Sequence, residues 1–330
     1  MARKPYQPPF TITPEILSLT VEIGELIGRI NSSSMLSVNP ILRRTNRIRS
    51  VYSSLAIEQN TLSFAQVTDV LNGKRVIAPP KDIIEVKNAY EIYEHLEQLN
   101  PFDIEDLLKA HGIMVRGLVD EAGQFRSGNV GVVDSQGQIL HFGTLPQYIP
   151  DMVEKLQDWV KRSDIPMLIK SCVFHYEFEV IHPFSDGNGR VGRLWHTLLL
   201  AKWQPVFAWL PVESIIHDRQ AEYYNAINAS NQSADSTAFI TYMLGAIKAA
   251  ILETISSAHQ ASQIKVEPVT EERWDTVEKW IKRHKFLRNA DLQNLLGIST
   301  ATASRLLREW TEEGKIVKER VGSYWTYHLS

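Results

Sequence analysis

The sequence predicts a mainly α-helical protein that has one β-hairpin in its larger part and a small C-terminal module. Apolar residues recur at helical spacing through most of the first 257 residues. At residues 129–142, β-branched residues flank a turn that contains glycine, which predicts a hairpin. The 330 residues are about twice the usual size of a domain, so two domains are expected.

Composition excludes several classes of protein. With 44% hydrophobic and 22% charged residues, the chain has ordinary globular composition, which argues against extended disorder. The net charge is −3, so any binding to nucleic acid or to a membrane must be local. Cys172 is the single cysteine and cannot form an internal disulfide, which fits a reducing compartment. No secretory signal or apolar run of about 18 residues is visible. We therefore expect a cytoplasmic protein without membrane contact.

The N-terminal region, residues 1–100, is expected to be helical. Helices are predicted from Pro14 to about Ile30, from Arg43 to Asn60 and from Asp82 to Leu99. Pro14 suits the first turn of a helix, and Pro79-Pro80 stops the chain before the third helix.

The core is expected to span residues 101–257 and to contain the hairpin, whose turn is predicted at Asp134–Gly137. Its helices are predicted by the same spacing of apolar residues. They are Ile104–Leu118, Pro150–Lys161, Pro166–Ile181, Arg190–Trp203, Arg219–Asn231 and Thr237–Ser257.

A polar linker is expected at residues 258–272, followed by a module at 273–330. The module's predicted order is three helices and a hairpin, which is the layout of a winged helix-turn-helix. Nine Lys and Arg against five Asp and Glu between residues 280 and 320 are compatible with DNA binding. Docking of a protein is the alternative. The helices are expected near Arg273–Lys285, Asp291–Gly297 and Ser299–Gly314, and the strands at Ile316–Arg320 and Tyr324–Leu329.

Residues 181–193, IHPFSDGNGRVGR, combine several groups suited to phosphate chemistry. The glycines allow a loop whose backbone N–H groups, with the helix that follows, can bind an anion. Arg190 and Arg193 lie three residues apart on that helix and can face the same anion. Asp186 is a hard oxygen ligand suited to Mg²⁺, and His182 can accept a proton from a hydroxyl. A lone DGNG would more often be an ordinary turn, but the full string favours phosphoryl or nucleotidyl transfer.

The string matches H-x-F-x-(D/E)-G-N-G-R-x-x-R, so residues 40–255 resemble the Fic (filamentation induced by cAMP) family. The resemblance implies an all-α core with a hairpin flap and transfer of AMP from ATP to a hydroxyl of a target protein. It further implies the roles of the motif residues. His182 would be the general base, Phe184 an anchor of the loop and Asp186 the Mg²⁺ ligand, while Gly187, Asn188 and Gly189 would hold the α-phosphate and Arg190 and Arg193 the β- and γ-phosphates.

A second match implies self-inhibition. Ser54–Glu58 resembles the (S/T)-x-x-x-E-(G/N) inhibitory helix of this family, expected here at about residues 43–60. By this resemblance Glu58 would pair with Arg193, because a carboxylate and a phosphate compete for one guanidinium. Gln59 departs from the pattern, since Gly or Asn is usual at that position.

Weaker resemblances concern the nucleoside and the target. Tyr223, Tyr224 and Asn231 resemble family positions that contact the nucleoside, with core tyrosines and a surface amide as the alternative. Ile139, Leu140 and His141 resemble the flap strand that docks the target by strand addition.

We therefore expect a self-inhibited protein adenylyltransferase that uses ATP and Mg²⁺ and modifies a target protein. Removal of AMP from a modified protein, or transfer of another phosphate-containing group, is an alternative at the same site. A nucleotide-sensing regulator that binds DNA is the alternative of another class. A homodimer is possible.

Overall fold

The structure is a computed structural model that describes residues 6–33, 40–133, 139–263, 271–296, 298, 300–321 and 324–330. The chain divides into two compact units, Met1–Ala258 and His259–Ser330, and each is described here by itself. The turn predicted at Asp134–Gly137 lies outside the described residues, as do the predicted end of a helix at Gly297 and its neighbour Ser299.

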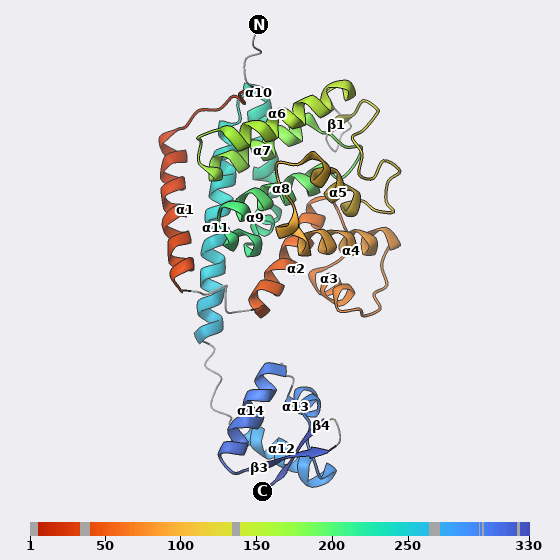
Figure 1. The fold of residues 1–330 in the computed structure, drawn as a ribbon, viewed down its shortest axis with the longest axis vertical. Coiled ribbons are helices and arrows are strands. Elements are labelled where there is room, and N and C mark those ends of the chain that lie inside the picture. Colours follow the sequence, from red (N-terminus) through yellow and green to blue (C-terminus); the bar gives the residue numbers. More distant parts are fainter. Residues whose placement is uncertain are drawn as a thin grey trace. The chain divides into compact units, whose positions relative to one another are not determined.

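The N-terminal part of the larger unit contains four helices (Figure 1). They are α1 (Pro14–Ser33), α2 (Pro40–Ile57), α3 (Phe64–Leu71) and α4 (Pro80–Glu94). The short helix α3 was not predicted from the sequence. Its signal is a capping box, in which the Ser63 side chain accepts a hydrogen bond from the Gln66 amide and the Gln66 side chain accepts one from the Ser63 amide.

The remaining helices and the hairpin complete the larger unit. Short 3₁₀ turns occur at η1 (Leu96–Gln98), η2 (Pro146–Tyr148) and η3 (Pro205–Trp209). The sequence analysis also missed α9, which has seven residues and is too short for a clear helical pattern. The helices are α5 (Ile104–Met114), α6 (Ile149–Arg162), α7 (Met167–Ile181), α8 (Asn188–Trp203), α9 (Val212–Asp218), α10 (Gln220–Ser233) and α11 (Thr237–Gln263), and the strands are β1 (Gly131–Val133) and β2 (Ile139–Phe142).

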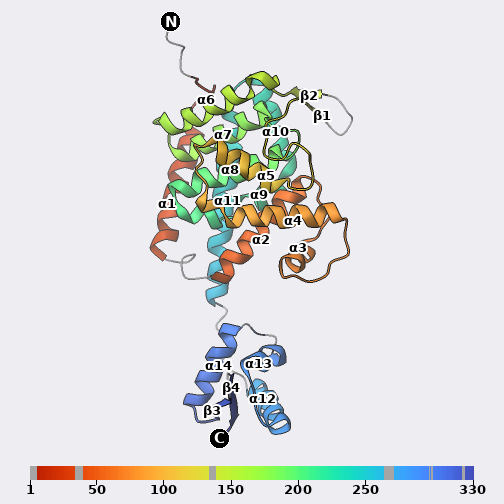
Figure 2. The same ribbon diagram turned by 45° about the vertical axis from the view of Figure 1, so that its right-hand side comes forward.

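Two consecutive helices, α7 and α8, form the centre of the core. Every residue from Leu168 to Phe178 is buried, and so are nearly all residues of α8 up to Leu200. A helix that is buried all round needs neighbours on every side. Figures 1 and 2 show the other helices of the unit around this pair. The loop between α7 and α8 carries the motif, so the most buried part of the protein supports it.

The hairpin is short and antiparallel, with Gly131 opposite Phe142 and an irregularity between Val132 and Val133. It extends from the larger unit (Figure 2). The mainly α fold with this hairpin is the one that the sequence predicts, and it is confirmed.

The expectation that the chain has no apolar run long enough to cross a membrane is wrong. Residues Thr237–Ser257 of α11 are long and apolar enough to cross a membrane, with a mean hydropathy of 1.5. Half of this stretch is buried within the unit, and Phe239, Met243 and Ile247 belong to the core. The core of a protein also produces helices of this composition, so the absence of membrane contact stays a prediction. The helix also continues to Gln263, into the segment expected to be a linker.

A buried carboxylate joins four helices of the larger unit. Glu213 of α9 is 1% exposed and accepts hydrogen bonds from Ser50 of α2, Tyr93 of α4 and Thr197 of α8. The first two oxygen–oxygen distances are 2.8 Å. Because a buried carboxylate needs such partners, this cluster holds α2 and α4 against α8.

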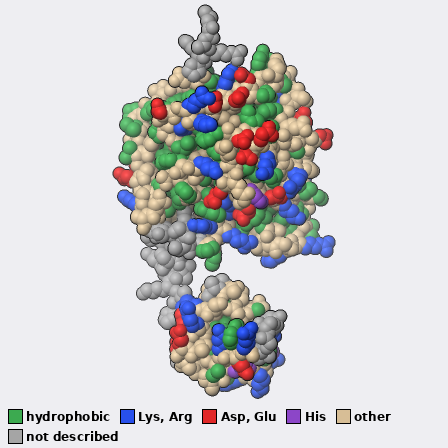
Figure 3. Space-filling model, viewed as in Figure 1, with side chains coloured by type: hydrophobic (Ala, Val, Ile, Leu, Met, Phe, Trp, Pro, Cys, Tyr) green, Lys and Arg blue, Asp and Glu red, His purple; other side chains and the backbone are tan. Residues whose placement is uncertain are grey.

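The smaller unit has its own core and contains α12 (Glu271–His284), α13 (Asn289–Leu296), α14 (Thr300–Glu312), β3 (Ile316–Val321) and β4 (Tyr324–Leu329). This order agrees with the predicted one, and the winged-helix assignment stays a prediction. Figure 3 shows basic and acidic side chains mixed on the visible face of the larger unit and basic ones beside an apolar side chain on the smaller unit.

Three buried histidines predict that the larger unit loses stability in acid. Burial lowers the pKa of His111 and of His196 to about 4, and it also lowers the pKa of His175. The unfolded chain binds these protons near pH 6.5, so stability is fully present above that pH and falls between about 6.5 and 4. His111 and His196 each contribute up to about 3 kcal/mol. Glu179 opposes this trend: burial raises its pKa to about 7, so its contribution to stability falls as the pH rises from about 4.5 to 7.

Thermal unfolding between pH 4 and pH 7 measures this dependence. His196→Asn places an amide nitrogen near the position of Nδ1, which contacts the Ser171 carbonyl at 3.1 Å. This variant should show a shallower dependence than the parent chain. An unchanged slope would mean that His196 is not held neutral.

Candidate active site

The loop between α7 and α8 starts with a backbone reversal at His182. This residue adopts the left-handed conformation, with a φ of 51°, and its amide still donates to the Phe178 carbonyl. The buried Arg126 donates from Nε to the His182 carbonyl at 2.7 Å, and its Nη1 donates to the Gly128 carbonyl at 2.6 Å. Arg126 therefore fixes the base of the hairpin to the backbone of His182. The His182 ring is partly exposed, and its Nδ1 lies 3.3 Å from the Glu179 carbonyl.

Side chains inside the loop hold its shape. The Asn188 side chain accepts from the Phe184 amide and donates to the Phe184 carbonyl, at 2.9 and 2.8 Å. The Phe184 ring is fully buried and stacks on His111, with 3.7 Å between ring centroids. His111 accepts from the Gly123 amide at Nδ1, so its Nε2 carries the proton and donates to the Asp186 carbonyl at 3.1 Å. Both polar atoms of the Asn188 side chain are therefore bonded within the loop. A phosphate bound there would contact backbone amides and not this side chain.

Asp186 is a half-exposed carboxylate at the outer edge of the loop. Its Oδ1 accepts from the Gly187 amide at 2.6 Å and from Arg190 at 2.8 Å. Burial raises the pKa of Asp186, but the charge and hydrogen bonds of Arg190 and the Gly187 amide outweigh it, so the net shift is downward. Asp186 is thereby ionised at neutral pH.

The donor set around Asp186 fits Mg²⁺ held jointly with a nucleotide. Among the described residues no group of three or more His, Cys, Asp or Glu could hold a metal ion by itself. Mg²⁺ is commonly bound by one or two carboxylates together with substrate phosphates, so one exposed carboxylate beside an anion site is sufficient.

Arg193 is paired with the predicted inhibitory glutamate. Its side chain is 2% exposed, and its Nη2 donates to Glu58 Oε1 at 2.7 Å. Nε and Nη2 also donate to the hydroxyl and the carbonyl of Ser54, at 3.1 and 2.9 Å. Burial lowers the pKa of Arg193, but Glu58 and the other acids nearby outweigh it and raise it above its usual value.

Glu58 lies against the start of α8. A Cβ atom added to Gly189 would come within 2.3 Å of Glu58 Oε1 and within 3.0 Å of Arg193 Nη1. Glycine at this position is therefore required for the close approach of the carboxylate. The Glu58 carboxylate thus occupies part of the space where the helix N-terminus and Arg193 would hold an anion.

The backbone of the turn after Glu58 explains why Gly or Asn is usual at the position of Gln59. Gln59 has a φ of 67°, in the left-handed region that favours glycine and tolerates asparagine. The small or amide residue usual at this position in the family suits that conformation. Gln59 adopts the same conformation at a cost of about 1 kcal/mol.

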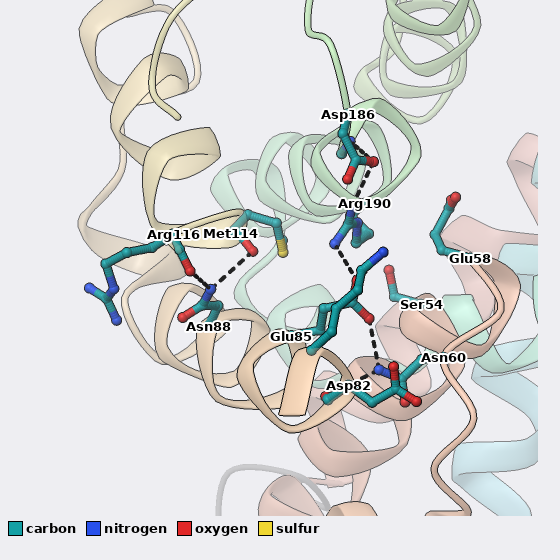
Figure 4. Close-up of polar contacts among 12 residues, drawn as sticks. Ser54, Glu58, Asn60, Asp82, Glu85, Asn88, Met114, Arg116, Asp186 and Arg190 are labelled. Carbon is teal, nitrogen blue, oxygen red and sulfur yellow. Dashed lines mark hydrogen bonds and ion pairs between the residues drawn. The ribbon is translucent and has the colours of Figure 1, made fainter. Parts of the chain in front are cut away.

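Arg190 faces a different helix from Arg193. Its Nη1 lies 3.4 Å from Glu85 Oε1 of α4, and its Nη2 holds Asp186 (Figure 4). Glu85 Oε2 accepts from Asn60 at 2.8 Å. A continuous polar chain therefore runs from Asp186 through Arg190 and Glu85 to Asn60.

The residues predicted to contact the nucleoside or the target lie in different surroundings. Tyr223 is 2% exposed, and its hydroxyl contacts His175, so it lies in the core. Tyr224 is 44% exposed, and burial and Glu58 raise its pKa, so it lies nearer the site. Asn231 accepts from the Tyr176 hydroxyl at 2.9 Å. Ile139, Leu140 and His141 lie on β2, where the structure describes only the backbone.

Sequence reasoning missed three residues of this site. His111 and Glu85 belong to helices far from the motif in sequence, and no local pattern marks them. Glu179 lies one helical turn before His182, and burial raises its pKa to about 7. Its position directly before the motif is the one signal that could have drawn attention to it.

Comparison with known proteins identifies the family. Residues 101–200 match the Fic/DOC family. The protein adenylyltransferase fic-1 of Caenorhabditis elegans is 31% identical in an alignment of 279 positions that covers 75% of this chain and 52% of that protein. The protein adenylyltransferase Fic of Nematostella vectensis is 28% identical in an alignment of 206 positions that covers 58% of this chain and 45% of that protein. This chain thus spans about half the length of these relatives.

A solved structure matches almost the whole chain. The crystal structure of a Fic family protein from Desulfovibrio desulfuricans G20 is 42% identical, with a TM-score of 0.76, and the match covers 98% of each chain. This chain belongs to the Fic family.

Proposed function

We propose that this chain is a protein adenylyltransferase that transfers AMP from ATP to a hydroxyl group of a target protein and is restrained by its own Glu58. The observation that carries the proposal is the Glu58–Arg193 pair beside an intact motif loop, at 2.7 Å. Two relatives, whose alignments cover 75% and 58% of this chain, are named protein adenylyltransferases. A carboxylate placed on a phosphate-binding arginine is expected for a restrained nucleotide enzyme.

The proposed chemistry assigns one step to each group of the chain. His182 accepts the proton of the target hydroxyl, whose oxygen forms a bond to the α-phosphorus while the bond to pyrophosphate breaks. The backbone amides of Gly187–Gly189 stabilise charge that develops on the α-phosphate. Arg190 and Arg193 orient the β- and γ-phosphates. Mg²⁺ on Asp186 would neutralise phosphate charge when bound.

The chain acts in the cytoplasm, and its target is a protein with an accessible Ser, Thr or Tyr, docked through β2. A homodimer and DNA binding by the smaller unit stay predictions. On that unit Lys318 and Arg320 lie 4.2 and 5.7 Å from the ring of Trp325, which is 49% exposed. A footprint on DNA without any label transfer would favour the regulator instead.

His182→Ala should reduce AMP transfer by about 10²–10⁴-fold and leave ATP binding nearly intact, because it removes the base and no phosphate contact. Incorporation of label from α-labelled ATP measures transfer, and calorimetry measures binding. His95→Ala changes an exposed histidine at the end of α4 and serves as the matched control. Near-normal transfer by His182→Ala would contradict its role as base.

Glu58→Gly should raise label transfer by roughly five- to 150-fold, because it frees Arg193 for the γ-phosphate. Arg193→Ala should lower transfer, and the double variant should not recover, because both anions compete for that arginine. Release of AMP from a modified protein, assayed with the same variants, distinguishes the reverse reaction. Equal transfer by the parent chain and Glu58→Gly would mean that Glu58 does not inhibit.

Gln59→Gly should strengthen the restraint, because glycine adopts the left-handed conformation without steric cost. We expect about 1 kcal/mol higher stability of the larger unit, and transfer by the otherwise unchanged chain should fall severalfold. Thermal unfolding and label incorporation measure the two effects. In a Glu58→Gly background the substitution should not lower transfer, and a loss there would trace its effect to another cause.

A further inference from the structure

Both motif arginines are paired with carboxylates from the N-terminal helices, but the two carboxylates differ in environment. Glu58 holds Arg193 at 2.7 Å, and its side chain is 37% exposed. Glu85 lies 3.4 Å from Arg190, and its side chain is 8% exposed. Glu58 can turn toward water when an anion replaces it. Glu85 is enclosed and stays in place, so it can support Arg190 but is poorly suited to leave it.

The two oxygens of Glu85 serve different partners. Oε1 faces Arg190 Nη1, with Lys81 Nζ at 3.8 Å, and Oε2 accepts from Asn60 Nδ2 at 2.8 Å. Asn60 follows Glu58 by two residues, and its Nδ2 also donates to the Asp82 carbonyl at 3.2 Å. The first turn of α4 therefore holds the segment that presents Glu58 (Figure 4).

The guanidinium of Arg190 is only partly hydrogen-bonded while Glu85 holds it. Nη2 contacts Asp186, which is half-exposed, and Nε is buried without a hydrogen-bond partner in the described part of the chain. A guanidinium fixed at Nη1 presents its other nitrogens in one orientation, which lowers the entropy lost when an anion binds.

We propose that Glu85 is a positioning residue with two effects: it orients Arg190 for the nucleotide phosphates, and through Asn60 it anchors the turn that presents Glu58 to Arg193. This inference rests on the proposed function. It connects the restraint at Arg193 with the support of Arg190 through one buried carboxylate.

The two effects can be separated, because they need different properties of Glu85. Orientation of Arg190 needs the negative charge, whereas Asn60 needs only an acceptor oxygen. Glu85→Gln removes the charge and keeps a carbonyl oxygen for Asn60. Asn60→Ala removes the anchor and leaves the charge. Glu94→Gln is the matched control, because Glu94 is another α4 carboxylate, paired with Arg47 at 3.6 Å.

The experiment measures nucleotide affinity and AMP transfer for these variants with Glu58 intact and in the Glu58→Gly background. Affinity is measured with Mg²⁺ and an ATP analogue whose α–β bridging oxygen is replaced by methylene, which cannot release pyrophosphate. In the Glu58→Gly background, Glu85→Gln should weaken analogue binding by about 5–20-fold, raise KM for ATP in proportion and leave kcat within about threefold. Glu94→Gln should change none of these values.

Asn60→Ala should act in the opposite direction. With Glu58 intact it should raise transfer and analogue affinity by about 3–10-fold, because the inhibitory turn loses its bonds to Glu85 and to the Asp82 carbonyl and is held less firmly. In the Glu58→Gly background it should have no further effect, because nothing remains to be released. Thermal unfolding confirms that each variant is folded. If Asn60→Ala does not fold, Asn60→Ser keeps a side-chain oxygen as an acceptor for the Leu62 amide and removes the amide donor that faces Glu85 without adding a charge.

Two results would overturn the inference. Parent-like analogue affinity in Glu85→Gln would remove the role at Arg190, and an equal rise for Asn60→Ala in both backgrounds would remove the anchoring role. If Glu58→Gly transfers no label at all, the proposed function fails. The binding measurements then still decide the role of Glu85, because analogue affinity does not require transfer.

Discussion

The buried guanidinium of Arg193 joins the N-terminal helices to the motif helix α8. A charge that is 2% exposed requires partners, and Ser54 and Glu58 supply three hydrogen bonds to it. Ser54 belongs to α2 and Glu58 directly follows it, so the charge holds the end of α2 against α8. The Glu213 cluster holds the same helix one turn earlier, at Ser50. The N-terminal helices therefore pack as part of one unit with the motif loop.

The motif loop itself combines strained backbone with rigid support. His182 and Gly187 both have positive φ, and the reversal between two buried helices needs them. Asn188 and Arg126 hold the loop by hydrogen bonds to backbone carbonyls. The ring of His111 covers Phe184. Because these supports are buried, the groups that stay partly exposed include two that the proposed chemistry needs, the His182 ring and the Asp186 carboxylate.

The sequence predicted local features well and contacts between distant segments poorly. The motif and the long helices were predicted because their signals lie within one continuous stretch of chain. The helices α3 and α9 were missed because they are too short for a clear helical pattern. The pairing of Glu58 with Arg193 was predicted by resemblance to the family alone. Glu85, Asn60 and His111 act across tens of residues, and a single glutamate in a helix has no signature of its partner. Tyr223 was predicted to contact the nucleoside, with the core as the alternative, and it lies in the core. The sequence around an aromatic residue does not distinguish these two environments.

The difference in exposure between Glu58 and Glu85 decides which of them can act as a switch. Moving Glu58 away from Arg193 returns a carboxylate that is already one-third exposed to water, so its desolvation cost is recovered. An incoming phosphate then satisfies the arginine, and no buried charge is left unpaired. Moving Glu85 would leave an enclosed carboxylate, the Arg190 guanidinium and the Asn60 amide without partners at the same time. A nucleotide can therefore compete with Glu58 at modest cost, while Glu85 remains in place in both states.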